Sequence, residues 1–109
     1  MKSPPCVLVV EPDRFERDRL GMWLNDAGYE VWLCPGPQDA AHACIALTGH
    51  SCALANGADV VVLDRDLSDA PALRASYEGL GLPVLGLDRP AERRALLQDL
   101  FLVIEGKER

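Results

Sequence analysis

Short apolar runs alternate along this chain with longer amphipathic segments. Four runs have the length and apolar content of buried strands, at residues 6–10, 30–34, 59–63 and 83–87. Apolar residues recur at helical spacing in four further segments, at residues 13–27, 37–47, 68–81 and 88–104. Strands that alternate with helices predict a parallel sheet covered by helices on both faces, wound with right-handed crossovers.

The limits of the predicted helices follow from capping and breaking residues. Asp13 can cap the first helix, and Glu16 three residues later completes a capping-box-like pair. The stripes expected to face the core are Phe15, Leu20, Trp23, Leu24 and Ala27 in the first helix; Leu73, Tyr77 and Leu80 in the third; and Leu96, Leu97, Leu100, Phe101 and Ile104 in the last. Residues 48–58 are small and polar, so we expect a loop or a frayed helical extension there.

Composition narrows the class of protein. The chain has 109 residues, 49% of them hydrophobic, which predicts a single domain over residues 1–109. Its 11 Lys and Arg residues against 17 Asp and Glu residues give a net charge of -6, which argues against nucleic acid or an anionic membrane as partner. Because no apolar run approaches the roughly 20 residues of a membrane span, we expect a cytoplasmic protein.

The four cysteines are too few and too scattered to predict a disulfide framework. Two His-x-Cys pairs, His42 with Cys44 and His50 with Cys52, contain the ligand types of tetrahedral zinc. Residues two apart on a regular helix point in nearly opposite directions, so His42 and Cys44 could not both bind one ion from such a helix. A zinc- or thiol-based sensor is nevertheless kept as one alternative function.

Acidic residues follow three of the four predicted strands. Glu11 and Asp13 come after the first strand, Asp64 after the third and Asp88 after the fourth. The carboxyl ends of parallel strands meet at one edge of the sheet, where such folds bind their ligands. Carboxylate oxygens there could hold Mg²⁺, and the metal would help a carboxylate to accept a phosphoryl group.

Three segments resemble the receiver domain of two-component response regulators: residues 7–13 (VLVVEPD), 28–31 (GYEV) and 58–64 (ADVVVLD). The resemblance covers roughly residues 6–88. It implies a flavodoxin-like (CheY-like) three-layer α/β sandwich with a parallel sheet. It also implies that Asp64 matches the phosphoacceptor and that Glu11 and Asp64 match metal-binding positions.

The chain departs from the receiver pattern at several positions. Pro12 stands where the resemblance implies a second acidic metal ligand, and proline offers no side-chain oxygen. Asp88 stands at the Thr or Ser switch position, where a carboxylate would repel a phosphoryl group. Arg89 resembles the family's Lys before a Pro but comes too soon after Asp64. Either the fourth helix and fifth strand are absent, or the fourth strand and its helix are, and both alternatives leave about four strands.

These departures favour a phosphorylation-independent pseudo-receiver, a non-enzymatic protein–protein interaction module in bacterial signalling or regulation. We expect no cofactor, since Mg²⁺ would lack the ligand replaced by Pro12. The first alternative is a phosphorylatable single-domain response regulator with Asp64 as phosphoacceptor. Mg²⁺-dependent modification of Asp64 would distinguish this alternative from the pseudo-receiver.

Residues 100–104 (LFLVI) are five consecutive apolar residues, which cannot all face one side of a helix. Either this run is a strand, or the last helix is buried on more than one side. A lost strand would also uncover a sheet edge, which proteins normally protect. We therefore expect a homodimer that uses the terminal helix or the open edge, with Leu100, Phe101, Val103 and Ile104 as the expected interaction residues.

Overall fold

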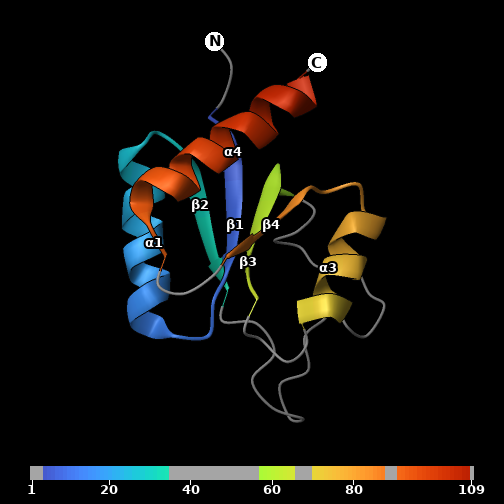
Figure 1. The fold of residues 1–109 in the computed structure, drawn as a ribbon, viewed down its shortest axis with the longest axis horizontal. Helices are drawn as coiled ribbons and strands as arrows, with labels where there is room; N and C mark the ends of the chain where they lie inside the picture. The colour runs from blue at the N-terminus through green and yellow to red at the C-terminus, as the bar shows by residue number, and fades with distance from the viewer. Residues whose placement is uncertain (1–3, 35–56, 66–69, 88–90, 109) are drawn as a thin grey trace.

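The computed structural model describes residues 4–34, 57–65, 70–87 and 91–108 of the chain (Figure 1). Its strands are β1 (Cys6–Val10), β2 (Glu30–Cys34), β3 (Val60–Asp64) and β4 (Val84–Leu87). All neighbouring strands are parallel, in the spatial order β2-β1-β3-β4. The four predicted strands are therefore confirmed to within one residue at each end.

Helices cover both faces of the sheet (Figure 1). Helix α1 (Arg14–Asp26) and helix α4 (Arg93–Glu108) pack on one face and contact each other, and helix α3 (Ala70–Gly79) packs on the other. The result is a three-layer α/β sandwich with a four-stranded parallel sheet, as the sequence predicts. None of the helices in the described part of the chain is long and apolar enough to cross a membrane.

The two central strands divide the core into two clusters. Successive side chains of a strand point to opposite faces, so Leu8 and Val10 pack under α3 while Val7 and Val9 pack under α1 and α4. Every residue of β1 and β3 is buried, which explains why both strands are apolar almost throughout. The exception is Asp64 at the end of β3.

Helix α1 begins as predicted, but its apolar stripe is narrower than expected. Leu20 and Leu24 are fully buried, whereas the side chain of Phe15 is 87% exposed and Ala27 is also exposed. At about 100° per residue, Phe15 lies roughly 140° around the helix axis from Leu20. The prediction that Phe15 and Ala27 face the core is therefore wrong.

The stripes predicted to face the core in α3 and α4 also include residues that the structure exposes. Leu80 follows the end of α3 and is 49% exposed, so it does not extend the buried pair Leu73 and Tyr77. Residues 100–104 lie within α4, so the alternative that this run is a strand is wrong. Leu100 is buried in the core, but Phe101 and Leu102 are 58% and 61% exposed. Helical geometry turns these two side chains away from the sheet.

The edge strand β2 carries a large aromatic residue on the α3 face of the sheet. Trp32 is half-buried, and its ring lies so close to Gly57 that a Cβ added at Gly57 would clash with it. This packing accounts for a glycine at that position. The predicted helix at residues 37–47, and most of the predicted loop at 48–58, lie outside the described residues.

Candidate functional site

Two acidic residues lie side by side at the carboxyl ends of the central strands. Val10 of β1 is in register with Leu63 of β3, so the next positions along the two strands are Glu11 and Asp64. Both carboxylates are buried, with only 1% of each residue exposed. Both residues also take part in a polar interaction. The structure thus brings together the two principal residues that the sequence predicted for this site.

The segment that follows β1 is fixed by backbone hydrogen bonds. The N–H of Glu11 donates to the carbonyl of Cys34 at 3.0 Å, which ties the end of β1 to the end of β2. Arg17 of α1 donates from Nη1 to the carbonyls of Glu11 at 2.9 Å and Pro12 at 3.4 Å. Arg17 therefore holds this turn through main-chain oxygens and was not identified from the sequence.

Asp13 caps helix α1. Its Oδ1 accepts hydrogen bonds from the N–H groups of Phe15 at 2.9 Å and Glu16 at 3.1 Å. This geometry satisfies two amides that have no partner within the helix. The Glu16 carboxylate pairs with Arg19 at 2.8 Å. Asp13 is therefore accounted for as a helix cap, which confirms the interpretation of its role from the sequence.

The donor set for a divalent cation is incomplete among the described residues. No group of three or more His, Cys, Asp or Glu residues there could hold a metal ion. Glu11 and Asp64 supply two carboxylates, Pro12 supplies no side-chain oxygen, and Asp13 is engaged as a cap. Mg²⁺ usually requires near-octahedral oxygen coordination, so the residues described do not fit it well.

Arg65 links this end of the sheet to β4. Its N–H donates to the carbonyl of Leu87 at 3.1 Å, and its side chain lies over Gly86, where an added Cβ would clash with the guanidinium. Gly86 stands within the fourth predicted strand, at residues 83–87. A glycine within a strand is also a signal of close approach by another group, and that signal could have revealed the contact.

A different set of polar groups lies at the amino ends of the strands. Asp59 Oδ2 accepts a hydrogen bond from the N–H of Cys6 at 2.8 Å. Burial raises the pKa of the Cys6 thiol, and the negative charges of Glu30 and Asp59 raise it further. Burial likewise raises the pKa of the Tyr29 hydroxyl. The Cys6 thiol is therefore not activated as a nucleophile.

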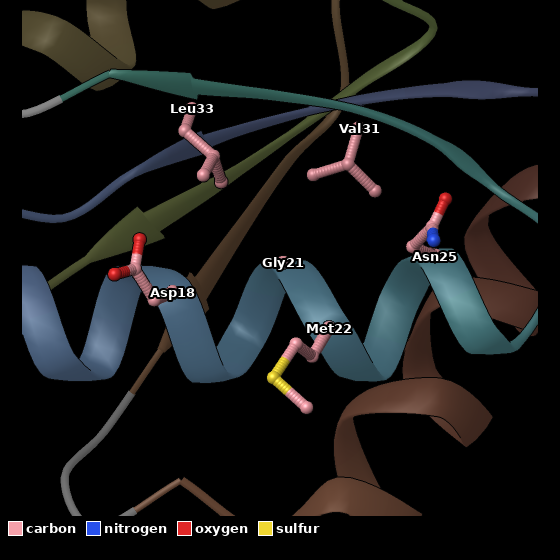
Figure 2. Close-up of a pocket in the computed structure, with 6 residues that line it drawn as sticks. All are labelled: Asp18, Gly21, Met22, Asn25, Val31 and Leu33. Carbon is pink, nitrogen blue, oxygen red and sulfur yellow. The ribbon is translucent and has the colours of Figure 1, made fainter.

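A surface hollow of about 400 Å³ lies between α1 and β2, away from the two buried carboxylates. Figure 2 shows Val31 and Leu33 pointing from β2 toward the helix, with Asp18 and Asn25 at either side. Gly21 permits the close approach, since a Cβ there would lie 3.3 Å from Leu33 Cδ2. No predicted site residue lines this hollow.

The remaining predicted site residues are distributed as follows. Asp88 and Arg89 lie outside the described residues, as do His42, Cys44, His50 and Cys52. Within the predicted interaction run on α4, Leu100 belongs to the core, Val103 and Ile104 are half-buried, and Phe101 is exposed. Leu102, which was not singled out for interaction, is exposed as well.

One curated regulatory protein is similar in sequence to most of this chain. No family model matches the chain. Over 78 residues the chain is 36% identical to the transcriptional regulatory protein AruR of Pseudomonas aeruginosa, a match that covers 72% of this chain and 30% of that protein. The chain thus spans about a third or less of the length of this curated relative.

Solved receiver structures are similar over nearly their whole length. A CheY-like receiver domain protein from Methanospirillum hungatei gives a TM-score of 0.73 at 17% identity, with 97% of this chain and 98% of that chain covered. The receiver domain of an HD domain-containing protein from Pseudomonas fluorescens gives 0.70 at 17% identity, with 99% and 92% covered. With its parallel order β2-β1-β3-β4 and an aspartate at the end of β3, the chain has the fold of a response-regulator receiver domain, with four strands in its described residues.

Proposed function

We propose that this chain is a pseudo-receiver: a receiver-fold module of a bacterial signalling or regulatory system that acts by binding another protein, independently of phosphorylation. In this proposal its output is an interaction rather than a catalysed reaction, and it works in the cytoplasm. The similarity to receiver domains and to a transcriptional regulatory protein supports a place in two-component signalling. The state of the acidic end of the sheet supports independence from phosphorylation.

The observation that carries the proposal is the environment of Asp64. Asp64 and Glu11 are buried side by side, Pro12 adds no oxygen, and Asp13 is occupied by the first turn of α1. Transfer of a phosphoryl group to a carboxylate brings negative charge into a site that already holds two acidic side chains. Without a well-held cation to neutralise that charge, the transfer is disfavoured.

The test is to restore the missing oxygen. We expect Pro12→Asp to create a third carboxylate beside Glu11 and Asp64, and Pro12→Ala to serve as the matched control without a ligand. In ¹⁵N–¹H spectra with Mg²⁺ up to about 20 mM, the native chain and Pro12→Ala should show no saturable shifts. Pro12→Asp should show saturable shifts centred on residues 11 and 64.

Each result bears on a separate part of the proposal. Saturable shifts in the native chain, lost in Asp64→Asn, would contradict the pseudo-receiver. Failure of Pro12→Asp to bind Mg²⁺, with the fold intact, would contradict the assignment of Pro12 as the lost ligand.

The second candidate is a phosphorylatable receiver with Asp64 as the phosphoacceptor. One observation favours it: Asp64 ends β3 beside an acidic residue at the end of β1, the pairing that the receiver resemblance implies for an active site. Under this candidate the native chain would bind Mg²⁺ and a phosphoryl mimic, so the same spectra distinguish the two functions.

A further inference from the structure

The outer edge of β4 has backbone groups that face away from the sheet. β4 is the last strand in the order β2-β1-β3-β4, and β3 is its only strand neighbour within the described residues. The carbonyls of Pro83 and Leu87 accept hydrogen bonds from the N–H groups of Val61 and Arg65, so both point toward β3. Backbone groups alternate in direction along a strand. The N–H and C=O groups of Val84 and Gly86 therefore point outward.

We propose that this edge pairs with the same edge of a second copy of the chain, with the two β4 strands antiparallel about a two-fold axis at Leu85. In an antiparallel ladder, two residues that both point at the partner exchange a pair of hydrogen bonds. With the axis at Leu85, Val84 faces Gly86 of the second copy, and Gly86 faces Val84 of that copy. Four backbone hydrogen bonds then satisfy all the outward groups of both edges.

Side chains on both faces of the sheet suit this register. Val84 and Gly86 lie on the α3 face, so each pair across the interface sets a branched side chain against a residue without one. Leu85 lies on the α4 face and is half-buried, and at the axis it would meet its own copy. Cross-strand pairs of apolar side chains stabilise antiparallel sheets.

Surface hollows border β4 on both faces of the sheet. The hollow on the α3 face has a volume of about 250 Å³ and is lined by Leu63, Arg65, Ala70, Pro71, Arg74, Val84 and Gly86. The hollow on the α4 face has a volume of about 200 Å³, and Leu85, Leu87, Leu96 and Asp99 are among its lining residues. The Arg65 side chain, which lies over Gly86, borders the hollow on the α3 face.

The charges beside the edge favour an antiparallel copy as the occupant. Arg74 and Glu78 lie one helical turn apart on α3, with Arg74 Nε 3.1 Å from Glu78 Oε1. Arg74 lines the hollow at the carboxyl half of β4, and Glu78 lines a hollow with Pro83 at its amino end. A two-fold axis reverses this row, so each Arg74 comes opposite Glu78 of the second copy. Opposite charges then meet twice across the interface.

This pairing does not require phosphorylation, so it can hold whether or not the proposed function is correct. A ladder of four hydrogen bonds over a short strand is a small interface. We therefore expect a dimer with a dissociation constant on the order of ten to a hundred micromolar.

The test compares Val84→Pro with Val84→Thr by light scattering and sedimentation from about 5 μM to about 1 mM. Proline removes an outward N–H but no bond to β3, and edge strands tolerate it. Threonine keeps the N–H and the branched shape. We expect Val84→Thr to dimerise and Val84→Pro to weaken the dimer about 30-fold or more, because two of the four hydrogen bonds are lost. Circular dichroism at low concentration confirms that each variant is folded.

Two further measurements make the result specific to this register. Amide hydrogen exchange at Val84 and Gly86 should slow as concentration rises, whereas exchange at Leu85 and Leu87, which face β3, should not. Arg74→Glu should weaken the dimer, and the double variant Arg74→Glu, Glu78→Arg should restore it. A native chain that is monomeric at about 1 mM, or a dimer that Val84→Pro leaves intact, would overturn the proposal.

Discussion

Polar groups are buried at the carboxyl ends of β1 and β3, whereas at the outer edge of β4 they point away from the sheet. At the strand ends, Glu11 and Asp64 are buried and engaged in polar interactions. At the edge, the backbone groups of Val84 and Gly86 point outward. In the first region the polar groups are already enclosed, whereas in the second they are directed at whatever lies beside the sheet. The two proposals above follow this difference: they place contact with another molecule at the side of the sheet rather than at its acidic end.

The largest expected effect is a loss of stability when the packing of α4 against β4 is weakened. Leu100 of α4 is fully buried in the cluster that includes Leu85 and Leu87, whereas Leu102 is 61% exposed. Leu100→Ala should lower the free energy of unfolding by about 3 kcal/mol, since it removes buried methyl groups and leaves a cavity. The matched change Leu102→Ala should cost less than about 0.5 kcal/mol. Urea denaturation measures both, and similar losses for the two variants would contradict the position assigned to this helix.

An intermediate effect tests whether Asp13 belongs to the helix or to the acidic site. Asp13→Ala removes the acceptor of two amide hydrogen bonds and should destabilise the protein by about 1 kcal/mol. Asp13→Asn keeps a side-chain oxygen and should retain most of the stability. Thermal denaturation with and without Mg²⁺ checks this. A Mg²⁺-dependent stabilisation that disappears in Asp13→Asn would instead make Asp13 part of a metal site.

The smallest effect involves the amino end of the sheet. Because the folded state raises the pKa of the Cys6 thiol, the unfolded chain loses this proton first as pH rises. At neutral pH the thiol is protonated in both states, so its titration does not change the free energy of unfolding. As pH rises above about 9 toward the folded-state pKa, the free energy of unfolding falls. Urea denaturation under reducing conditions should show a shallower fall for Cys6→Ala than for the native chain. Equal slopes in that pH range would contradict the role of burial and of the charges on Glu30 and Asp59.

The sequence predicts the fold and part of the acidic site because both depend on local order along the chain. Four apolar runs separated by amphipathic segments determine the strands, and the ends of parallel strands bring Glu11 and Asp64 together. The Asp13 cap is also local, since its acceptor and its donors lie within three residues.

Features that depend on packing between distant segments could not be predicted in this way. Phe15, Leu80 and Phe101 are apolar and near helical spacing, but helix phase and helix ends turn them to solvent. The contact of Arg65 with Gly86 joins two strands more than 20 residues apart along the chain. The outward direction of the Val84 and Gly86 amides depends on the register of β4 against β3.

The most direct test of the central claim is whether the native chain accepts a phosphoryl mimic at Asp64. ¹⁵N–¹H spectra recorded with Mg²⁺ and then beryllofluoride, for the native chain and Asp64→Asn, provide it. We predict that neither protein shows saturable shifts at residues 11, 64 and 65. Saturable shifts there in the native chain that are absent in Asp64→Asn would contradict the account and make this chain a phosphorylation-dependent switch.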